Sequence, residues 1–198
     1  MSVVSLPSVF RVTQFALTQM VNMRAFASPY VGSEQVVDML NDRWKAQLQV
    51  NMINMVDAAV MEAFINTLRM GVNVVNLYHY ARPVPRGTMR GTLALTAAAI
   101  AGASTLSFSG AGQAGTTLLA GDLINVGALL LMVAADATAD GTGAITVTLT
   151  NRLRVAQSLS AAVTWNQPTA PFRLVGTPSV AYINMRANSF MLDFNEAV

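Results

Sequence analysis

Hydrophobic and polar residues alternate strictly through the segment RWKAQLQVNMI, in which every second residue from Trp44 to Met52 is apolar. A period of two is the pattern of a strand with one buried face. A weaker alternation runs through residues 10–26, and a clear one returns at residues 190–195. The pattern therefore predicts one or two early strands, a middle strand that carries Trp44, and a final strand.

A helical period replaces this alternation in the next segment, where Val60, Phe64 and Leu68 are spaced by four residues. That spacing places the three side chains on one face of a helix. Aspartate is a common first residue of a helix and glycine a common last one. The sequence therefore predicts one short helix between Asp57 and Gly71.

The segment VNVVNLYHYA is rich in β-branched and aromatic residues, which favours a strand. It continues into RPVPRG, where Pro83 and Pro85 lack the N–H groups that a strand donates. We expect the chain to leave one domain and enter another at this point.

Residues 91–170 are rich in alanine, glycine, threonine and leucine, and contain short β-like pieces such as TLSFSG, DLINVG and AITVTLT. Turn signals such as ADGTG separate these pieces at spacings of about 8–12 residues, which favours a small all-β barrel or sandwich. After Pro178 the composition returns to that of the first 80 residues. The last strand is therefore expected to rejoin the first domain.

The expected fold class is mainly β with one short helix and two β-domains. Residues 1–88 together with 175–198 are predicted to form a β-sandwich-like oligomerisation domain. Residues 89–174 are predicted to form a small β-barrel inserted into it, which leaves both chain ends in the same domain.

Charged residues make up only 11% of the chain, whereas hydrophobic residues make up 53%. A protein surface with so few charges tends to associate. The longest apolar stretches, such as GALLLMVAA, fall short of the roughly 20 residues of a membrane-spanning helix. The start of the chain also lacks the pattern of a signal peptide. We therefore expect a soluble protein, made in a cytoplasm, whose surface is largely covered by other copies or other proteins.

Four arginines form the main concentration of positive charge, because no acidic residue lies between Glu62 and Asp122. They could bind nucleic acid, but strong binding needs roughly 6–10 phosphate contacts. Arginine is also enriched at protein interfaces, and we prefer this interpretation. The candidate interface or interdomain residues are the four arginines and the aromatic residues beside them: Arg69, Tyr78, His79, Tyr80, Arg82, Arg86 and Arg90.

Catalytic chemistry has little support in the sequence. His79 is the single histidine, no GxSxG motif accompanies it, and cysteine is absent. The carboxylates are scattered, so no metal site and no cofactor are expected. A hydrolase that depends on His79 remains a third hypothesis, and we expect no enzyme.

Trp165 supports an alternative of a different class. A tryptophan on a β-barrel can stack on a sugar, although in an alternating strand it is more often part of the core. The alternative function is therefore a carbohydrate-binding module of a virion, used in host attachment.

The order of several segments resembles the tail structural proteins of tailed bacteriophages, particularly distal tail proteins. The first domain carries NDRWKAQLQVNMI, then DAAVMEAFINTLRMGVNVV, then PRG. The later segments LLAGDLINVG and VTWNQPTAPFRLV are similar to the second β-domain of these proteins, and SFMLDFNEAV resembles their last strand. The stretch from Val72 to Tyr80 departs from the family's pattern.

The resemblance implies a non-enzymatic, ring-forming component of the tail tip or baseplate. Such a ring, expected to be a hexamer, would join the tail tube to the hub and the receptor-binding protein. It would be assembled in the host bacterial cytoplasm and would contact nucleic acid only as DNA passes through its lumen. No membrane contact is implied. In this interpretation His79 is structural and the arginines bond to neighbouring backbone or to a neighbouring subunit.

Overall fold

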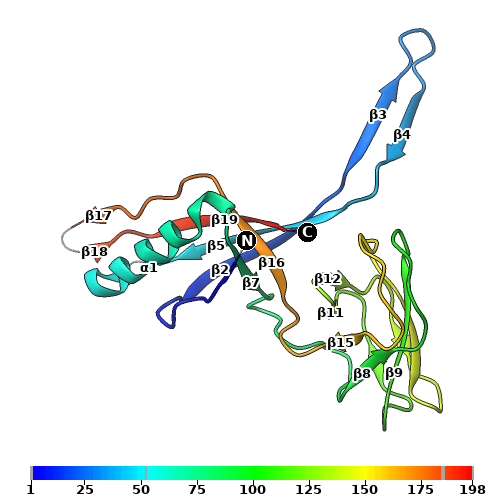
Figure 1. The fold of residues 1–198 in the computed structure, drawn as a ribbon. Helices are drawn as coiled ribbons and strands as arrows, with labels where there is room; N and C mark the ends of the chain where they lie inside the picture. Colours follow the sequence, from blue (N-terminus) through cyan, green and yellow to red (C-terminus); the bar gives the residue numbers. More distant parts are fainter. Residues whose placement is uncertain (1, 52, 184–185, 198) are drawn as a thin grey trace. The chain divides into compact units, whose positions relative to one another are not determined.

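The computed structural model describes residues 2–51, 53–183 and 186–197 and shows a mainly β protein (Figure 1). Within these residues there is one α-helix, α1 (Met55–Thr67), followed by a short 3-10 turn, η1 (Arg69–Gly71). The predicted fold class, mainly β with one short helix, is confirmed.

The chain divides into two compact units: unit 1 contains residues 1–18, 44–84 and 166–198, and unit 2 contains residues 19–43 and 85–165. This division differs from the expected boundaries at residues 85–88, which group with unit 2, and in two longer stretches. Residues 19–43 group with unit 2, and residues 166–174 group with unit 1. The second difference has a clear cause, because Phe172 pairs with Val75 in a sheet of unit 1. Strands of both units alternate in the same way, so alternation alone does not assign a strand to one of them.

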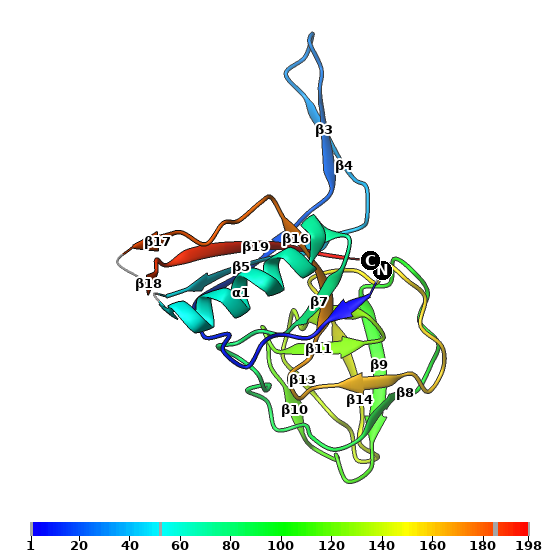
Figure 2. The same cartoon turned by 60° about the vertical axis from the view of Figure 1, so that its left-hand side comes forward.

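One sheet of six strands organises unit 1 (Figures 1 and 2). Its order is β1 (Val3–Val4), β7 (Val74–Leu77), β16 (Ala170–Val175), β19 (Phe190–Glu196), β5 (Arg43–Val50) and β2 (Val12–Met20). The pair β1–β7 is parallel, whereas β7–β16, β16–β19 and β19–β5 are antiparallel.

The alternation predicted for β5 and β19 is confirmed. Every second residue of β5 is buried, beginning with Trp44, which is 2% exposed. On β19, Leu192 and Phe194 are fully buried and lie opposite Leu48 and Ala46 of β5. These facing apolar pairs form the central part of the core of unit 1.

Helix α1 lies alongside this sheet in both views (Figures 1 and 2). Its N-cap is Asn54 rather than Asp57, because the Asn54 side chain accepts the backbone N–H of Asp57 at 2.8 Å. The buried stripe contains Met61 and Phe64, but Val60 is 43% exposed. Of the three residues that the spacing placed on one face, Phe64 and Leu68 are buried, and Val60 lies at the exposed edge of the stripe.

Unit 2 contains a six-stranded sheet that curls toward closure. Its order is β12 (Leu129–Met132), β11 (Leu123–Val126), β15 (Ala162–Thr164), β8 (Leu93–Leu95), β9 (Thr105–Gly110) and β14 (Ala144–Thr148). A β-bridge between Val133 and Leu149 joins the chain just beyond the two outermost strands. Inside lies an apolar cluster that includes Phe108 and Ile124, both 0% exposed.

Three small sheets complete the described structure. In unit 2, β10 (Thr117–Leu118) pairs with β13 (Ala137–Thr138). In unit 1, β17 (Tyr182–Ile183), β18 (Arg186–Ala187) and β6 (Ile53–Asn54) form one sheet. A separate antiparallel ribbon is made by β3 (Met23–Ala27) and β4 (Glu34–Asp38).

Candidate assembly interface

The chain passes from unit 1 to unit 2 at Pro85-Arg86-Gly87, a segment that we call the crossing. One buried carboxylate of unit 2 holds it in place. Asp122 is 3% exposed, and its oxygens accept the backbone N–H groups of Arg86 at 2.8 Å, Gly87 at 3.0 Å and Leu119 at 2.8 Å. The Arg86 side chain adds an ion pair with Asp122 at 3.9 Å. A buried charge with this many donors is well stabilised, so Asp122 fixes the chain where it enters the barrel.

Gly87 is required at this crossing by close packing. A Cβ atom at this position would lie 2.2 Å from the backbone oxygen of Thr117, a distance that no side chain can tolerate. Arg86 and Gly87 are therefore each needed at the crossing, and for different structural reasons. Arg86 binds Asp122 and the carbonyl of Ala120, and Gly87 allows two backbones to touch.

Arg90 is also used inside unit 2. Its guanidinium donates to the carbonyl groups of Pro85, Gly87 and Met89, at distances between 2.6 and 3.1 Å. These contacts join the side chain of Arg90 to the backbone of the five residues before it. Arg86 and Arg90 thus bond to neighbouring backbone within their own unit.

Trp165, the candidate carbohydrate residue, is partly buried against the barrel core. The guanidinium of Arg90 lies 4.9 Å from the centre of its ring, and its Nε1 donates to the carbonyl of Gly91 at 2.8 Å. A cation over the ring occupies the position that a stacked sugar would take on that face. The surroundings of Trp165 therefore give the sugar-binding alternative no positive support.

His79 belongs to an aromatic cluster in unit 1. The ring of Phe15 meets its imidazole edge-on at 4.8 Å, and its Nδ1 accepts the backbone N–H of Arg82 at 3.1 Å. Burial, and then the charge of Arg82, lower the pKa of His79 below 6.5. The imidazole is therefore neutral near pH 7 and acts as a hydrogen-bond acceptor within the fold.

The two tyrosines on either side of His79 pack against each other, with ring centres 4.5 Å apart. Burial raises the pKa of Tyr80, and Tyr78 raises it further. The Tyr80 hydroxyl is buried and has no hydrogen-bond partner within the described residues. The cluster consequently fills space in unit 1 and presents no ionised group.

The seven candidate interface residues fall into three places. Tyr78, His79, Tyr80 and Arg82 are consecutive or nearly so in unit 1, whereas Arg86 and Arg90 belong to unit 2. Arg69 lies apart from both groups, in the turn η1 at the end of α1, and is exposed. Among the five candidates in unit 1, Arg69 and Arg82 are exposed, whereas the three aromatic residues are buried or half-buried.

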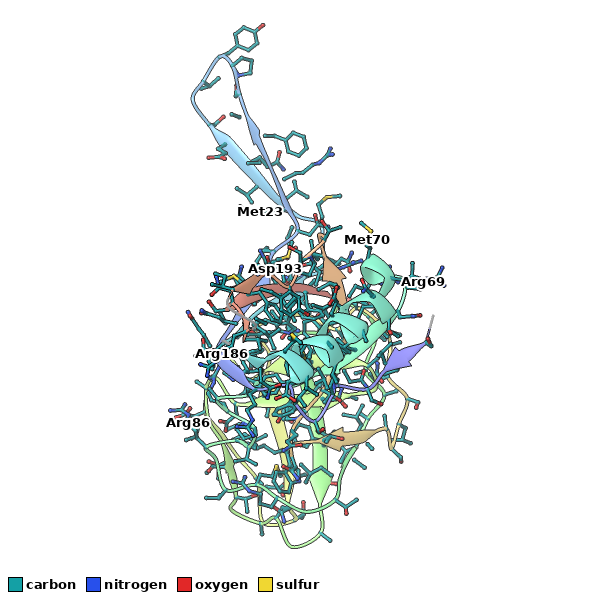
Figure 3. All side chains as sticks on the ribbon, turned by 90° about the vertical axis from the view of Figure 1, so that its left-hand side faces the viewer. Met23, Arg69, Met70, Arg86, Arg186 and Asp193 are labelled. Carbon is teal, nitrogen blue, oxygen red and sulfur yellow. The ribbon has the colours of Figure 1, made fainter. Side chains whose placement is uncertain are left out.

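The ribbon of β3 and β4 exposes nearly all its side chains. Every residue of β3 is exposed, and Val37 is the one half-buried residue of β4. Figure 3 shows side chains leaving both faces of the ribbon, from Met23 at its base to the tip. The large apolar residues of the ribbon and its flanks are 40% to 93% exposed: Met20, Val21, Met23, Phe26, Tyr30, Val31, Val36, Met39 and Leu40.

The base of the ribbon is tied to the rest of unit 2. The carboxylate of Asp38 lies 3.4 Å from the guanidinium of Arg152. Arg154 donates to the carbonyl of Asp42 at 3.0 Å, and Gln19 donates to the Asp42 carboxylate at 3.1 Å. The ribbon is therefore anchored at its base while its apolar residues remain uncovered.

The sequence contains one local signal for this ribbon. The prediction of one or two early strands covered most of β3, but β4 was missed. The segment SPYVGS, with proline and glycine between two pieces of equal length, is a turn signal that could have predicted the hairpin. The alternation on either side is poor because neither face of the ribbon is buried.

No protein-family model matches this sequence, and no curated protein matches it. None of the helices within the described residues is long and apolar enough to cross a membrane. In the part of the chain that the structure describes, no three histidine, aspartate or glutamate side chains gather into a metal site.

Proposed function

We propose that the protein is a non-enzymatic structural subunit of a bacteriophage tail that assembles into a ring at the tail tip. In this proposal the ring is a hexamer that joins the tail tube to the hub and the receptor-binding protein. The proposal is supported by the order of segments that resembles distal tail proteins, by the low content of charged residues, and by the exposed ribbon of β3 and β4.

The exposed ribbon is the observation that carries this proposal. Its nine large apolar residues together equal about five fully exposed side chains, or on the order of 600–800 Å² of apolar surface. A stable protein interface covers roughly 800 Å² on each partner. Isolated two-stranded hairpins are only marginally stable in water, so a second copy that covers the ribbon would stabilise both chains.

The charges of unit 2 are consistent with a subunit of this kind. Arg86 and Arg90 already bond to backbone within their own unit, which favours a structural role over a basic patch for nucleic acid. Contact with passing DNA would then fall to exposed arginines such as Arg82. An enzymatic role for His79 finds no support in its neutral, hydrogen-bonded state.

The decisive experiment is a mass measurement of the purified protein by light scattering over a range of concentrations. We expect a closed oligomer of one fixed size, with six copies as the expected number. Electron microscopy of the same sample should show rings, and labelled antibodies should locate the protein at the tail tip of assembled particles. A single subunit at high concentration that is also missing from particles would contradict the proposal.

A matched pair of substitutions tests the ribbon itself. Val31 and Ile100 are 77% and 75% exposed, and both belong to unit 2. We expect Val31→Asp to shift the oligomer toward single subunits, because a charge would be buried without a partner in the interface. Ile100→Asp should leave the mass unchanged. Equal behaviour of the two variants would remove the ribbon from the interface, even if the wild-type protein forms a ring.

A further inference from the structure

A cavity of about 300 Å³ opens in unit 1 beside the C-terminal end of α1. Ile65 of α1 and Leu174 of β16 line it and are 8% and 4% exposed, so they provide an apolar floor. Asn66 and Thr177 lie at its border with exposed polar side chains. The cavity has the size and the mixed lining of a small ligand site.

The turn that forms one wall of this cavity has an unusual backbone. Arg69, Met70 and Gly71 have φ angles of +46°, +52° and +88°, which is the left-handed region. This conformation is unfavourable for residues that carry a side chain, such as Arg69 and Met70. It is held here by close packing, because a Cβ atom on Gly71 would lie 2.8 Å from the backbone oxygen of Leu174. Strain of this kind gathers at functional sites.

The strained turn places an arginine without a partner at the rim of the cavity. Figure 3 shows the side chains of Arg69 and Met70 directed outward at the end of α1. Both residues are exposed, and among the described residues no carboxylate lies within 4.0 Å of the Arg69 guanidinium. The residues that line the cavity include no acid. The site is therefore positively charged above an apolar floor.

We propose that this cavity binds the C-terminal end of a partner polypeptide whose last residue is aliphatic. The aliphatic side chain would cover Ile65 and Leu174, and the terminal carboxylate would receive two hydrogen bonds from Arg69. An arginine fork matches a carboxylate in this way. A single terminal residue combines the acid and the apolar group at the short separation that a cavity of this size requires. This site goes beyond the ring proposed above, because it binds another protein rather than a second copy.

The test uses the full chain with labelled methyl groups, followed by NMR. The probe is the peptide acetyl-Gly-Gly-Leu with a free carboxylate, and its C-terminal amide is the matched control. We expect the acid to shift the methyl signals of Ile65, Met70 and Leu174. The amide should bind about tenfold more weakly, since it lacks the charge-assisted hydrogen bonds.

Two arginine variants complete the test. Arg69→Gln should lose affinity for the acid by about tenfold, to the level of the amide. Arg186→Gln removes another exposed arginine of unit 1, one that does not line the cavity, and should bind like the wild-type protein.

Three outcomes would overturn this site: equal binding of acid and amide, no shifts at millimolar peptide, or the same shifts with inorganic phosphate alone. The oligomeric mass is measured on the same samples. A single subunit that binds the acid would support the site and contradict the proposed ring. A ring that fails to bind the acid would do the reverse.

Discussion

Two antiparallel strand pairs of this chain have the same local pairing and opposite surroundings. In the barrel, β9 and β14 are joined through five residue pairs, and in the ribbon β3 and β4 are also joined through five. Phe108 of β9 is 0% exposed, whereas Phe26 of β3 is 54% exposed. The backbone ladder is thus the same, and the difference lies in what the side chains touch.

This difference shows where strand stability comes from. The barrel pair gains free energy because one face packs on a shared core. The ribbon has no such face, and its own hydrogen bonds add little in net terms. The exposed apolar side chains of the ribbon therefore support the proposal that a second copy covers it.

The largest expected effect comes from the two phenylalanines. Phe108→Ala should lower the free energy of unfolding by about 3–5 kcal/mol, because it leaves a cavity in the barrel core. Phe26→Ala should lower it by less than about 0.5 kcal/mol in the dissociated chain. The two losses of unfolding free energy are measured by urea denaturation, at a protein concentration at which any oligomer is dissociated. Equal losses would mean that the ribbon is packed as firmly as the barrel.

A smaller effect is expected from Asp122→Ala. Removing the carboxylate leaves the N–H groups of Arg86, Gly87 and Leu119 without their acceptor. The loss should be about 2–4 kcal/mol, measured by urea denaturation. Asp136→Ala is the control, because Asp136 is exposed and its carboxylate accepts one backbone N–H, from Ala120. A loss no greater than that of the control would show that the crossing is held by packing alone.

The smallest effect concerns pH and His79 in unit 1. Since the pKa of His79 is lowered in the folded state, the unfolded chain binds the proton more readily. The resulting stability is complete above pH 6.5 and falls as the pH drops below 6.5 toward the lowered value. Denaturation midpoints at pH 8, 7, 6 and 5 should follow this trend in the wild-type protein. His79→Gln should remove the part of the slope that lies just below pH 6.5, and an unchanged slope would assign it to other groups.

The sequence predicted those parts of the fold where one face of an element is buried. The strict alternation from Trp44 to Val50 gave a correct strand, and the repeat around Phe64 gave a correct helix with its first residue misplaced. The second strand of the ribbon, β4, was missed because a strand exposed on both faces needs no alternation. The boundary near Phe172 was missed because strand pairing over long distances in the chain leaves no local mark.

The candidate site shows the same limit. The motif Arg-Gly at residues 86 and 87 was recognised, but the partner that explains it, Asp122, lies 36 residues away from Arg86. The strained turn at Arg69 was not foreseen, because left-handed backbone at arginine and methionine contradicts local preference. Sites of this kind are visible only when the chain is folded.

The exposed ribbon also makes the newly made chain prone to aggregation. Until it is covered, two strands with free edges and many apolar side chains can pair with any other strand, which is the first step of fibrous aggregation. Pro29 at the turn and the charges of Arg24 and Glu34 slow such mispairing without preventing it. In the proposed ring a second copy covers the ribbon, so recovery of the protein should depend on how fast copies meet, and slow expression followed by dilute storage should increase precipitation.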